Sequence, residues 1–151
     1  MPNPPQGQGL IFLFSRKDTL REAIAYHRPG LRHCWLLVTP EMQAQAASVV
    51  GQYSDLTFTL HPLSGRYDSQ GCYRTIASIY REEAPRRGIA PRQVVADITG
   101  GTKPMTLGMI VACLEGDYPL EHVPTAFDAA GHPTGPLPPI QLVVQRQTGE
   151  R

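Results

Sequence analysis

Short apolar runs alternate along the chain with segments in which apolar residues recur at helical spacing. The runs 10–14 and 34–38 are continuously apolar, which is typical of strands buried on both faces of a parallel sheet. The run 56–60 alternates between apolar and polar residues, which predicts a strand towards a sheet edge. A fourth apolar run begins at Val94 and ends in a polar, glycine-rich turn.

The segments between these runs carry signals for helix starts and ends. The series from Thr19 to Glu22 has capping-box spacing, which predicts a helix beginning there and ending at Pro29-Gly30. Thr39 supplies an N-cap before Pro40 and predicts a second helix. A third helix is expected to end by residues 85–88, with one apolar face formed by Cys72, Ile76, Ile79 and Tyr80.

After residue 127 the chain becomes rich in turn-forming residues, and 140–144 alternates again. We therefore expect a pair of antiparallel strands, joined by a loop, to finish the sheet. Strands that alternate with helices predict right-handed crossovers, so the fold class is α/β, a Rossmann-like three-layer α/β/α sandwich. The sheet is expected to be mostly parallel and six-stranded, in the order 3-2-1-4-5-6, with a C-terminal antiparallel hairpin. A single domain over 10–147 should follow a disordered lead-in over 1–9.

The turn that follows the fourth strand carries the clearest chemical signal. It leads from Thr99 through Gly100-Gly101 and Thr102 to Lys103, and Pro104 then opens an apolar helix. Backbone N–H groups at a helix start point towards a ligand, and the helix dipole favours anions. Two glycines allow a large anion close to the backbone, and a lysine adds positive charge. The turn is therefore interpreted as a phosphate-binding site.

The kind of phosphate ligand is left open by the local pattern. The turn lacks the spacing of a Walker A loop, with no Ser or Thr after Lys103 to hold magnesium, and it lacks the G-x-G-x-x-G dinucleotide fingerprint. An ordinary strand-to-helix turn with a solvated lysine is the alternative. In the expected strand order, the turn 15–18 after the first strand is its neighbour, so the two turns should flank one pocket.

Composition narrows the function classes. The 151-residue chain has a formal net charge of +1, which gives no case for generic DNA or RNA binding. It has no apolar run long enough for a membrane span and no signal peptide, so we expect a cytoplasmic protein. The three cysteines should be core residues, and the histidines should be surface or packing residues. No metal site and no cofactor are expected.

The series Asp97-Ile98-Thr99-Gly100-Gly101-Thr102-Lys103-Pro104-Met105 resembles the signature turn of CRISPR-associated Rossmann-fold (CARF) domains. The segment 127–133, with the strand after it, is similar to the closing hairpin of that family. The first turn departs from the glycine-containing form common in the family.

The resemblance implies that the ligand is a cyclic oligoadenylate, the messenger of type III CRISPR antiviral defence, with cyclic tetra-adenylate as the expected ring. It also implies a homodimer with the ring at its two-fold axis, where an isologous pair of turns suits the ring's symmetry. Asp97 is expected to hold the turn. The expected ligand-binding residues are Ser15, Arg16, Tyr67, Thr99, Gly100, Gly101, Thr102, Lys103 and Met105.

Two functions remain open at this stage, and a third is more remote. The chain could be a stand-alone, metal-independent ring nuclease, in which a ribose 2′-OH attacks the adjacent phosphate while Lys103 and Ser15 stabilise the developing charge. No paired carboxylate or histidine pair is expected for metal-assisted hydrolysis. It could instead be a non-catalytic sensor domain, serving a separate effector or forming part of a larger one. The third alternative is another mononucleotide-binding Rossmann domain.

Overall fold

The computed structural model describes residues 2–145 and residue 147, and a six-stranded sheet forms its centre. The strand order is β3-β2-β1-β4-β5-β8, in which the first five strands are parallel and β8 is antiparallel to β5. The predicted order is thereby confirmed, with β8 as the sixth strand. The sheet strands are β1 (Gly9–Leu13), β2 (His33–Val38), β3 (Thr57–Pro62), β4 (Val94–Asp97), β5 (Leu120–His122) and β8 (Ile140–Leu142).

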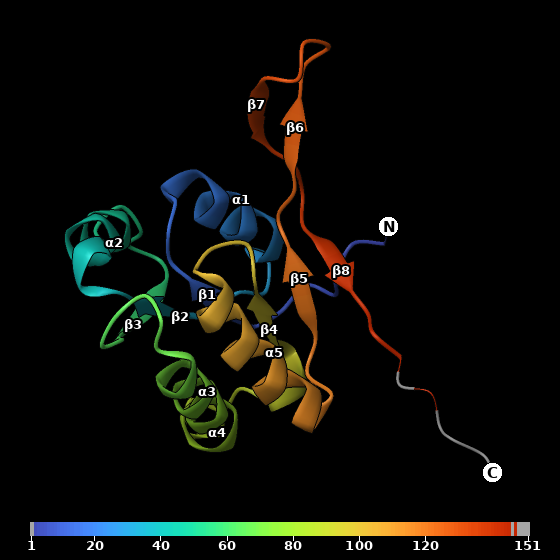
Figure 1. Cartoon of the computed structure of the whole chain (residues 1–151). Coiled ribbons are helices and arrows are strands. Elements are labelled where there is room, and N and C mark those ends of the chain that lie inside the picture. Colours follow the sequence, from blue (N-terminus) through green and yellow to red (C-terminus); the bar gives the residue numbers. More distant parts are fainter. Residues whose placement is uncertain (1, 146, 148–151) are drawn as a thin grey trace.

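Helices cover both faces of this sheet (Figure 1), as expected of a three-layer sandwich. Helices α1 (Lys17–His27) and α2 (Gln43–Val50) pack with one set of core residues, and α3 (Ser69–Ser78) and α5 (Lys103–Gly116) pack with another. Alternate residues of β1 divide between the two cores: Leu10 and Phe12 face α1, whereas Ile11 and Leu13 face α5. Because both faces are covered, every residue of β1 and β2 is buried.

The start of α1 differs from the capping-box prediction. The helix begins at Lys17, with Arg16 as N-cap, so Thr19 lies inside the first turn and is buried. The Thr19 hydroxyl donates to the Arg16 carbonyl oxygen (3.2 Å), and the Asp18 carboxylate accepts from the Thr19 N–H (2.8 Å). Asp18 thus satisfies the N–H group that Glu22 would have satisfied in the predicted capping box.

The third predicted helix is not one regular α-helix but three consecutive helical segments. After α3, residues Ile79–Glu83 form a π-helical turn, and α4 (Ala84–Arg86) completes the helix. Pro85 lies in α4 and has no N–H to donate, so the wider hydrogen-bonding pattern occurs just before it. The predicted end by residues 85–88 is consistent with this arrangement. The second predicted helix also begins with a separate 3₁₀ turn, Pro40–Met42, before α2.

The C-terminal strands are arranged differently from the simple pair expected. Strands β6 (Thr125–Phe127) and β7 (Pro133–Pro136) form their own two-stranded antiparallel sheet, and the chain then returns as β8 to complete the main sheet. Figure 1 shows this hairpin projecting from the body of the protein beyond the end of β5.

The N-terminal segment makes specific contacts that a disordered lead-in would not predict. The Gln141 N–H donates to the Pro2 carbonyl oxygen (2.8 Å), and the Asn3 side-chain amide donates to the Pro139 carbonyl oxygen (2.9 Å). Nearer to β1, Gly7 is buried, and its N–H donates to His27 Nδ1 (2.9 Å). This segment therefore runs along the β8 edge before it reaches the interior.

Candidate functional site

The turns after β1 and β4 meet at one cavity, as the strand order predicted. The cavity has a volume of about 280 Å³ and lies at the carboxyl ends of the parallel strands, where ligands bind in open α/β sheets. Its lining combines apolar side chains with hydroxyl and charged groups. The lining residues are Phe14, Ser15, Thr39, Glu41, Met42, Arg66, Gly101, Thr102 and Met105.

Both glycines of the second turn are required by its geometry. A Cβ atom on Gly100 would lie 2.1 Å from the Leu13 carbonyl oxygen and 2.6 Å from Ser15 Oγ. Gly101 has a φ of +83°, which is strained for any residue with a side chain. The two turns are therefore in direct contact, with Ser15 beside Gly100.

The turn presents unpaired backbone donors beside the start of α5. Among the described residues, none accepts a hydrogen bond from the N–H groups of Gly100, Gly101 or Thr102. Thr102 is the N-cap of α5, and its hydroxyl oxygen accepts from the Met105 N–H (3.4 Å). The same hydroxyl donates to the Arg66 carbonyl oxygen, so it is already occupied on both sides. Free amides at a helix start are the kind of donors that bind anions in proteins.

Five of the predicted ligand-binding residues do not line the cavity, and Gly100 of the turn is one of them. Lys103 is exposed at the start of α5, and Arg16 is paired with Asp18 at 2.5 Å on the protein surface. Tyr67 is 78% exposed, within the loop after β3. The Thr99 hydroxyl oxygen accepts from the Val123 N–H (2.7 Å), so it fastens the turn to the segment after β5.

The loop after β3 contributes a cation that sequence reasoning missed. Arg66 lines the cavity and forms an ion pair with Glu41 (3.4 Å), which lies just after β2. Both side chains are at least half exposed, so the pairing is weak and the guanidinium is accessible to an anion. The sequence signal for this cation was the long polar loop itself, but the residue of that loop predicted to contact the ligand was the neighbouring Tyr67.

A buried polar cluster lies directly behind the turn. Asp97 Oδ1 accepts from the Thr99 N–H (2.8 Å), so Asp97 holds the turn, as expected. Asp97 and Glu121 occupy paired positions on β4 and β5, and their carboxyl groups interact. Glu121 Oε1 lies 2.5 Å from Nε2 of His27, at the end of α1. All three side chains are fully buried.

This cluster contains a pair of carboxyl groups, whereas the sequence predicted no carboxylate pair for metal-assisted hydrolysis. Asp97 and Glu121 are such a pair, but their burial keeps them out of contact with the cavity. Burial, together with the neighbouring carboxyl group, raises the pKa of Asp97 well above its usual range. Burial also raises the pKa of Glu121 to about 7 and lowers the pKa of His27 to about 4.

The cysteines are the core residues that were predicted. Cys34, Cys72 and Cys113 are buried and unpaired, and burial raises the pKa of Cys72 and Cys113 to about 12. Over residues 2–145 and 147, no three His, Cys, Asp or Glu side chains are grouped closely enough to hold a metal ion. None of the helices in this part of the chain is long and apolar enough to cross a membrane.

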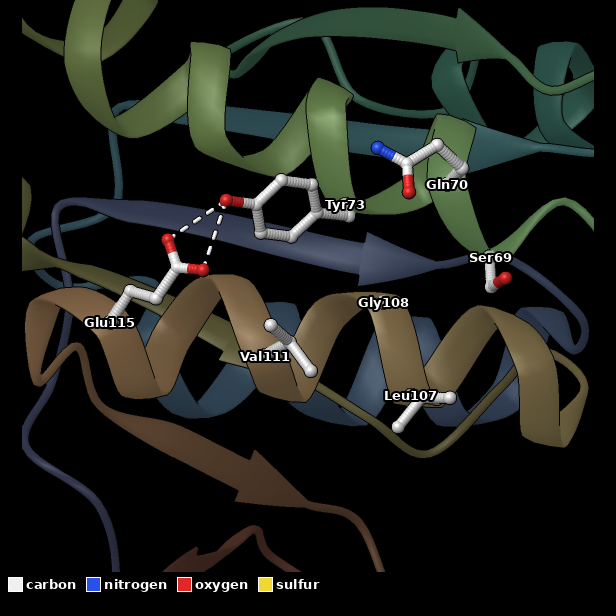
Figure 2. Close-up of a pocket in the computed structure, with 7 residues that line it drawn as sticks. All are labelled: Ser69, Gln70, Tyr73, Leu107, Gly108, Val111 and Glu115. Carbon is white, nitrogen blue, oxygen red and sulfur yellow. Dashed lines mark hydrogen bonds between the residues drawn. The ribbon is translucent and has the colours of Figure 1, made fainter.

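A second hollow lies on the outer side of the α3–α5 pair (Figure 2). It has a volume of about 230 Å³, and Leu107 and Val111 of α5 line it with exposed fractions of 59% and 40%. At its far end the Tyr73 hydroxyl contacts both carboxylate oxygens of Glu115 at 2.8–2.9 Å. Lys103, Leu107 and Val111 follow at intervals of four residues, so this apolar strip begins beside the β4 turn.

Comparison with solved structures identifies the fold. A type III CRISPR defence DNA nuclease activated by cyclic oligoadenylate matches with a TM-score of 0.64 and 26% identity over 89% of this chain and 22% of that protein. Can2 from Sulfobacillus thermosulfidooxidans, solved with cyclic tetra-adenylate, matches with a TM-score of 0.62 and 17% identity over 79% of this chain and 33% of that chain.

Csm6 from Enterococcus italicus, solved with cyclic hexa-2′-fluoro-hexa-dAMP, matches with a TM-score of 0.60 and 13% identity over 78% of this chain and 34% of that chain. No family model matches the sequence, and no curated protein matches it significantly. The class is thus an α/β Rossmann-like fold, and within it this chain has the CARF fold. The chain spans between about a fifth and a third of the length of the solved proteins it resembles.

Proposed function

We propose that this chain is a cyclic oligoadenylate-binding CARF protein of type III CRISPR signalling. The observation that carries the proposal is the cavity at the carboxyl ends of β1 and β4, with three unpaired amides of the turn beside it. Amides at a helix start suit phosphate oxygens, and the apolar side chains of Phe14, Met42 and Met105 suit a base. The solved proteins with this fold, bound to or activated by such ligands, support the ligand class.

Two copies of the chain share the ring in this proposal. Drug-sized ligands occupy pockets of about 300–1,000 Å³. One cavity of about 280 Å³ therefore holds only part of a cyclic oligonucleotide. In the arrangement we propose, the two-fold axis that brings both turns to one ring runs along the strand direction, which places side surfaces of the two copies in contact.

The α3–α5 face is the surface we assign to that contact. It carries two exposed apolar residues, Leu107 and Val111, in line with Lys103 at the site. Buried apolar side chains drive most protein association. In this arrangement the two Lys103 ammonium groups approach one another beside the turns, and an anionic ring offsets their repulsion.

The dimer is tested with Leu107→Asp, which introduces a charge at the centre of the α3–α5 face. Sedimentation velocity should show the wild-type chain as a dimer and Leu107→Asp as a monomer with an unchanged circular dichroism spectrum. Phe127→Asp is the matched control, because Phe127 is 64% exposed on the β6–β7 hairpin. Dissociation by Phe127→Asp alone would assign the interface to the hairpin instead.

Ligand binding is tested with radiolabelled cyclic tetra-adenylate and cyclic hexa-adenylate. Lys103→Ala removes a charged contact worth about 1.5–3 kcal/mol, so we expect binding to weaken by about ten- to a hundredfold. Arg92→Ala is the control, because Arg92 lies at the opposite end of β4. Absence of binding of either ring by the wild-type chain would refute the proposed function.

Ring cleavage is the second candidate function, and the position of the Ser15 hydroxyl on the cavity wall favours it. A ribose 2′-oxygen would attack the adjacent phosphorus and lose its proton, and the 5′-oxygen would leave and take up a proton. The products are a 2′,3′-cyclic phosphate end and a 5′-hydroxyl end. Ser15, Lys103 and the free amides would stabilise negative charge on the phosphorus oxygens.

Incubation of the labelled ring with protein and EDTA separates cleavage from binding. Linear products with a cyclic phosphate end would establish a metal-independent ring nuclease, and Ser15→Ala should slow their formation. A ring that stays intact and comigrates with the protein would establish a sensor domain, which passes the signal to a separate effector or to the rest of a larger one. We propose that either function operates in the cytoplasm.

A further inference from the structure

The buried cluster behind the β4 turn has a hydrogen-bonding pattern that determines where its protons are. The Gly7 N–H donates to His27 Nδ1, so that nitrogen carries no proton. His27 is therefore neutral, and its Nε2–H donates to Glu121 Oε1 at 2.5 Å. A backbone N–H, that of Thr99, already donates to Asp97 Oδ1.

The remaining two carboxyl oxygens then require a shared proton. Asp97 Oδ2 and Glu121 Oε2 are buried, and neither accepts a hydrogen bond from an N–H or hydroxyl donor in the described part of the chain. The two side chains occupy paired positions on the neighbouring strands β4 and β5, and ionised carboxylates only accept hydrogen bonds. One proton between these two oxygens satisfies both groups and leaves the pair with a single negative charge.

Holding a turn with a buried pair of acidic side chains has a cost in folding free energy. Burying a charge costs free energy that one hydrogen bond does not recover. An amide in place of either carboxyl group could make the same contacts without a shared proton. The cluster nevertheless joins the N-terminal segment, α1, β5 and the β4 turn in one chain of contacts, from Gly7 to Thr99.

We propose that Asp97, Glu121 and His27 are positioning residues, which hold the ligand-binding turn through the proton shared by Asp97 and Glu121. Asp97 fixes the Thr99 N–H, and this sets the direction of the free amides at Gly100 and Gly101. The role in ligand binding rests on the proposed function of the turn. Loss of the shared proton would place two like charges in contact, and the turn would loosen as Asp97 moves away.

Few other charges act on this pair. The ionisable groups that interact with the pair are His27 and Tyr26, both on α1. The Tyr26 ring packs edge-on against His27 at 4.9 Å, and the Tyr26 hydroxyl donates to the Pro4 carbonyl oxygen. No cation among the described residues is paired with either carboxyl group. The shared proton is therefore the main factor that offsets the repulsion between the two carboxyl groups.

Hydrogen exchange of the turn tests the proposal without a ligand. Glu121→Gln keeps the contacts, because the amide oxygen accepts from His27 and the amide nitrogen donates to Asp97, whereas Glu121→Met removes both. After correction for intrinsic exchange, the hydrogen-bonded amides of Ile98 and Thr99 in the wild-type chain should lose protection as the pH rises from 6 to 9.5. Glu121→Gln should show no such loss, and Glu121→Met should be at least tenfold less protected at pH 6.

The same variants then test the link to ligand binding. The affinity of the wild-type chain for labelled cyclic tetra-adenylate should fall with rising pH, and the Glu121→Gln profile should be flat. A Glu121→Gln profile that parallels wild type in both measurements would overturn the proposal, even if Glu121→Met fails to fold. Failure of the wild-type chain to bind the ring would refute the function of the turn, and the exchange data would still decide the role of the cluster.

Discussion

Gly100 lies where the β4 turn passes closest to the end of β1. Its missing side chain leaves room for the Leu13 carbonyl oxygen and Ser15 Oγ, both of which a Cβ atom would overlap. The neighbouring carbonyl belongs to a buried strand and cannot move aside independently. The contact between the two walls of the site therefore depends on this glycine.

Gly100→Ala should consequently affect both stability and the site. Overpacking a close contact costs about 1–3 kcal/mol, so we expect a loss of that size in the free energy of unfolding, measured in urea. Ligand binding should weaken as well, because the turn must shift away from Ser15. Gly65→Ala is the control, since no atom lies within 4 Å of the place its added methyl group would occupy and its φ is not positive. Equal stability of the two variants would contradict the proposed close contact.

The residues of the site differ in how far sequence could predict them. The contiguous turn from Thr99 to Lys103 was predictable because strand, glycines and helix start are adjacent in the chain. Glu121 and His27 were not, since their contact joins positions 94 residues apart and only the folded sheet brings them together. Arg66 was missed because a polar loop gives no signal for which of its side chains faces a cavity.

At the scale of elements, the packing of α3 against α5 depends on a second glycine. A Cβ atom on Gly108 would lie 2.3 Å from the Ser69 carbonyl oxygen and 3.0 Å from the Tyr73 backbone nitrogen. Both of these atoms belong to the backbone of α3, so the close approach of the two helices at this position depends on the missing side chain. The hollow in Figure 2 lies over this crossing.

Gly108→Ala should force the two helices apart and lower the free energy of unfolding by about 1–3 kcal/mol. Gly51→Ala, at the end of α2, is the matched control because its added methyl group would make only ordinary contacts at 3.6–3.7 Å. That substitution should be neutral or stabilising by about 0.4–1 kcal/mol. Thermal unfolding, monitored by circular dichroism, distinguishes the two variants. A Gly108→Ala variant as stable as the wild-type chain would show that the helices adjust freely.

Regular elements were predicted better than their ends. Apolar runs placed four of the five parallel strands, β1 to β4, or their starts, because burial on both faces leaves little room for polar residues. The short strand β5 was not placed by such a run. The start of α1 was misplaced because the helix begins two residues before Thr19, whose N–H donates to Asp18 and whose hydroxyl donates to the Arg16 carbonyl oxygen. The π-helical turn before Pro85 was not foreseen, because apolar periodicity continues through it at Ile79 and Tyr80.

For the whole molecule, buried histidines link stability to pH. His33 Nδ1 and Nε2 contact the Thr57 and Thr59 hydroxyls at 2.6 and 2.7 Å, and burial lowers the pKa of His33 to about 4. The unfolded chain, with an ordinary histidine pKa near 6.5, binds more protons between pH 6.5 and 4. Stability contributed by neutral His33 is therefore lost as the pH falls through that range.

We expect acidification from pH 6.5 to 4.5 to reduce the free energy of unfolding by up to about 1.4 kcal/mol per pH unit for His33. His27 acts in the same direction, whereas the raised pKa of Glu121 acts in the opposite one. His33→Gln should remove the contribution of His33 to this pH dependence, so the free energy of unfolding of the variant should depend less steeply on pH. Urea denaturation at several pH values measures the slopes, and parallel slopes would show that His33 is already charged in the folded state.

The overall topology followed from the alternation of strands and helices, with one exception in the last quarter of the chain. The β6–β7 hairpin and β8 were expected to form one closing pair. Short strands rich in turn formers carry little information about their partners, so sequence could not separate the hairpin from the sheet.

The contact between the N-terminal segment and β8 also bears on self-association. An open strand edge is a template on which other chains can add strands and aggregate. Pro2 and Asn3 shield part of the β8 edge, where the Gln141 N–H would otherwise be free. A chain lacking residues 1–4 should scatter more light on concentration than the full chain, whereas Asn3→Ala, which leaves the Pro2 contact, should scatter less than the truncation. The first residues of this protein would then serve its colloidal stability.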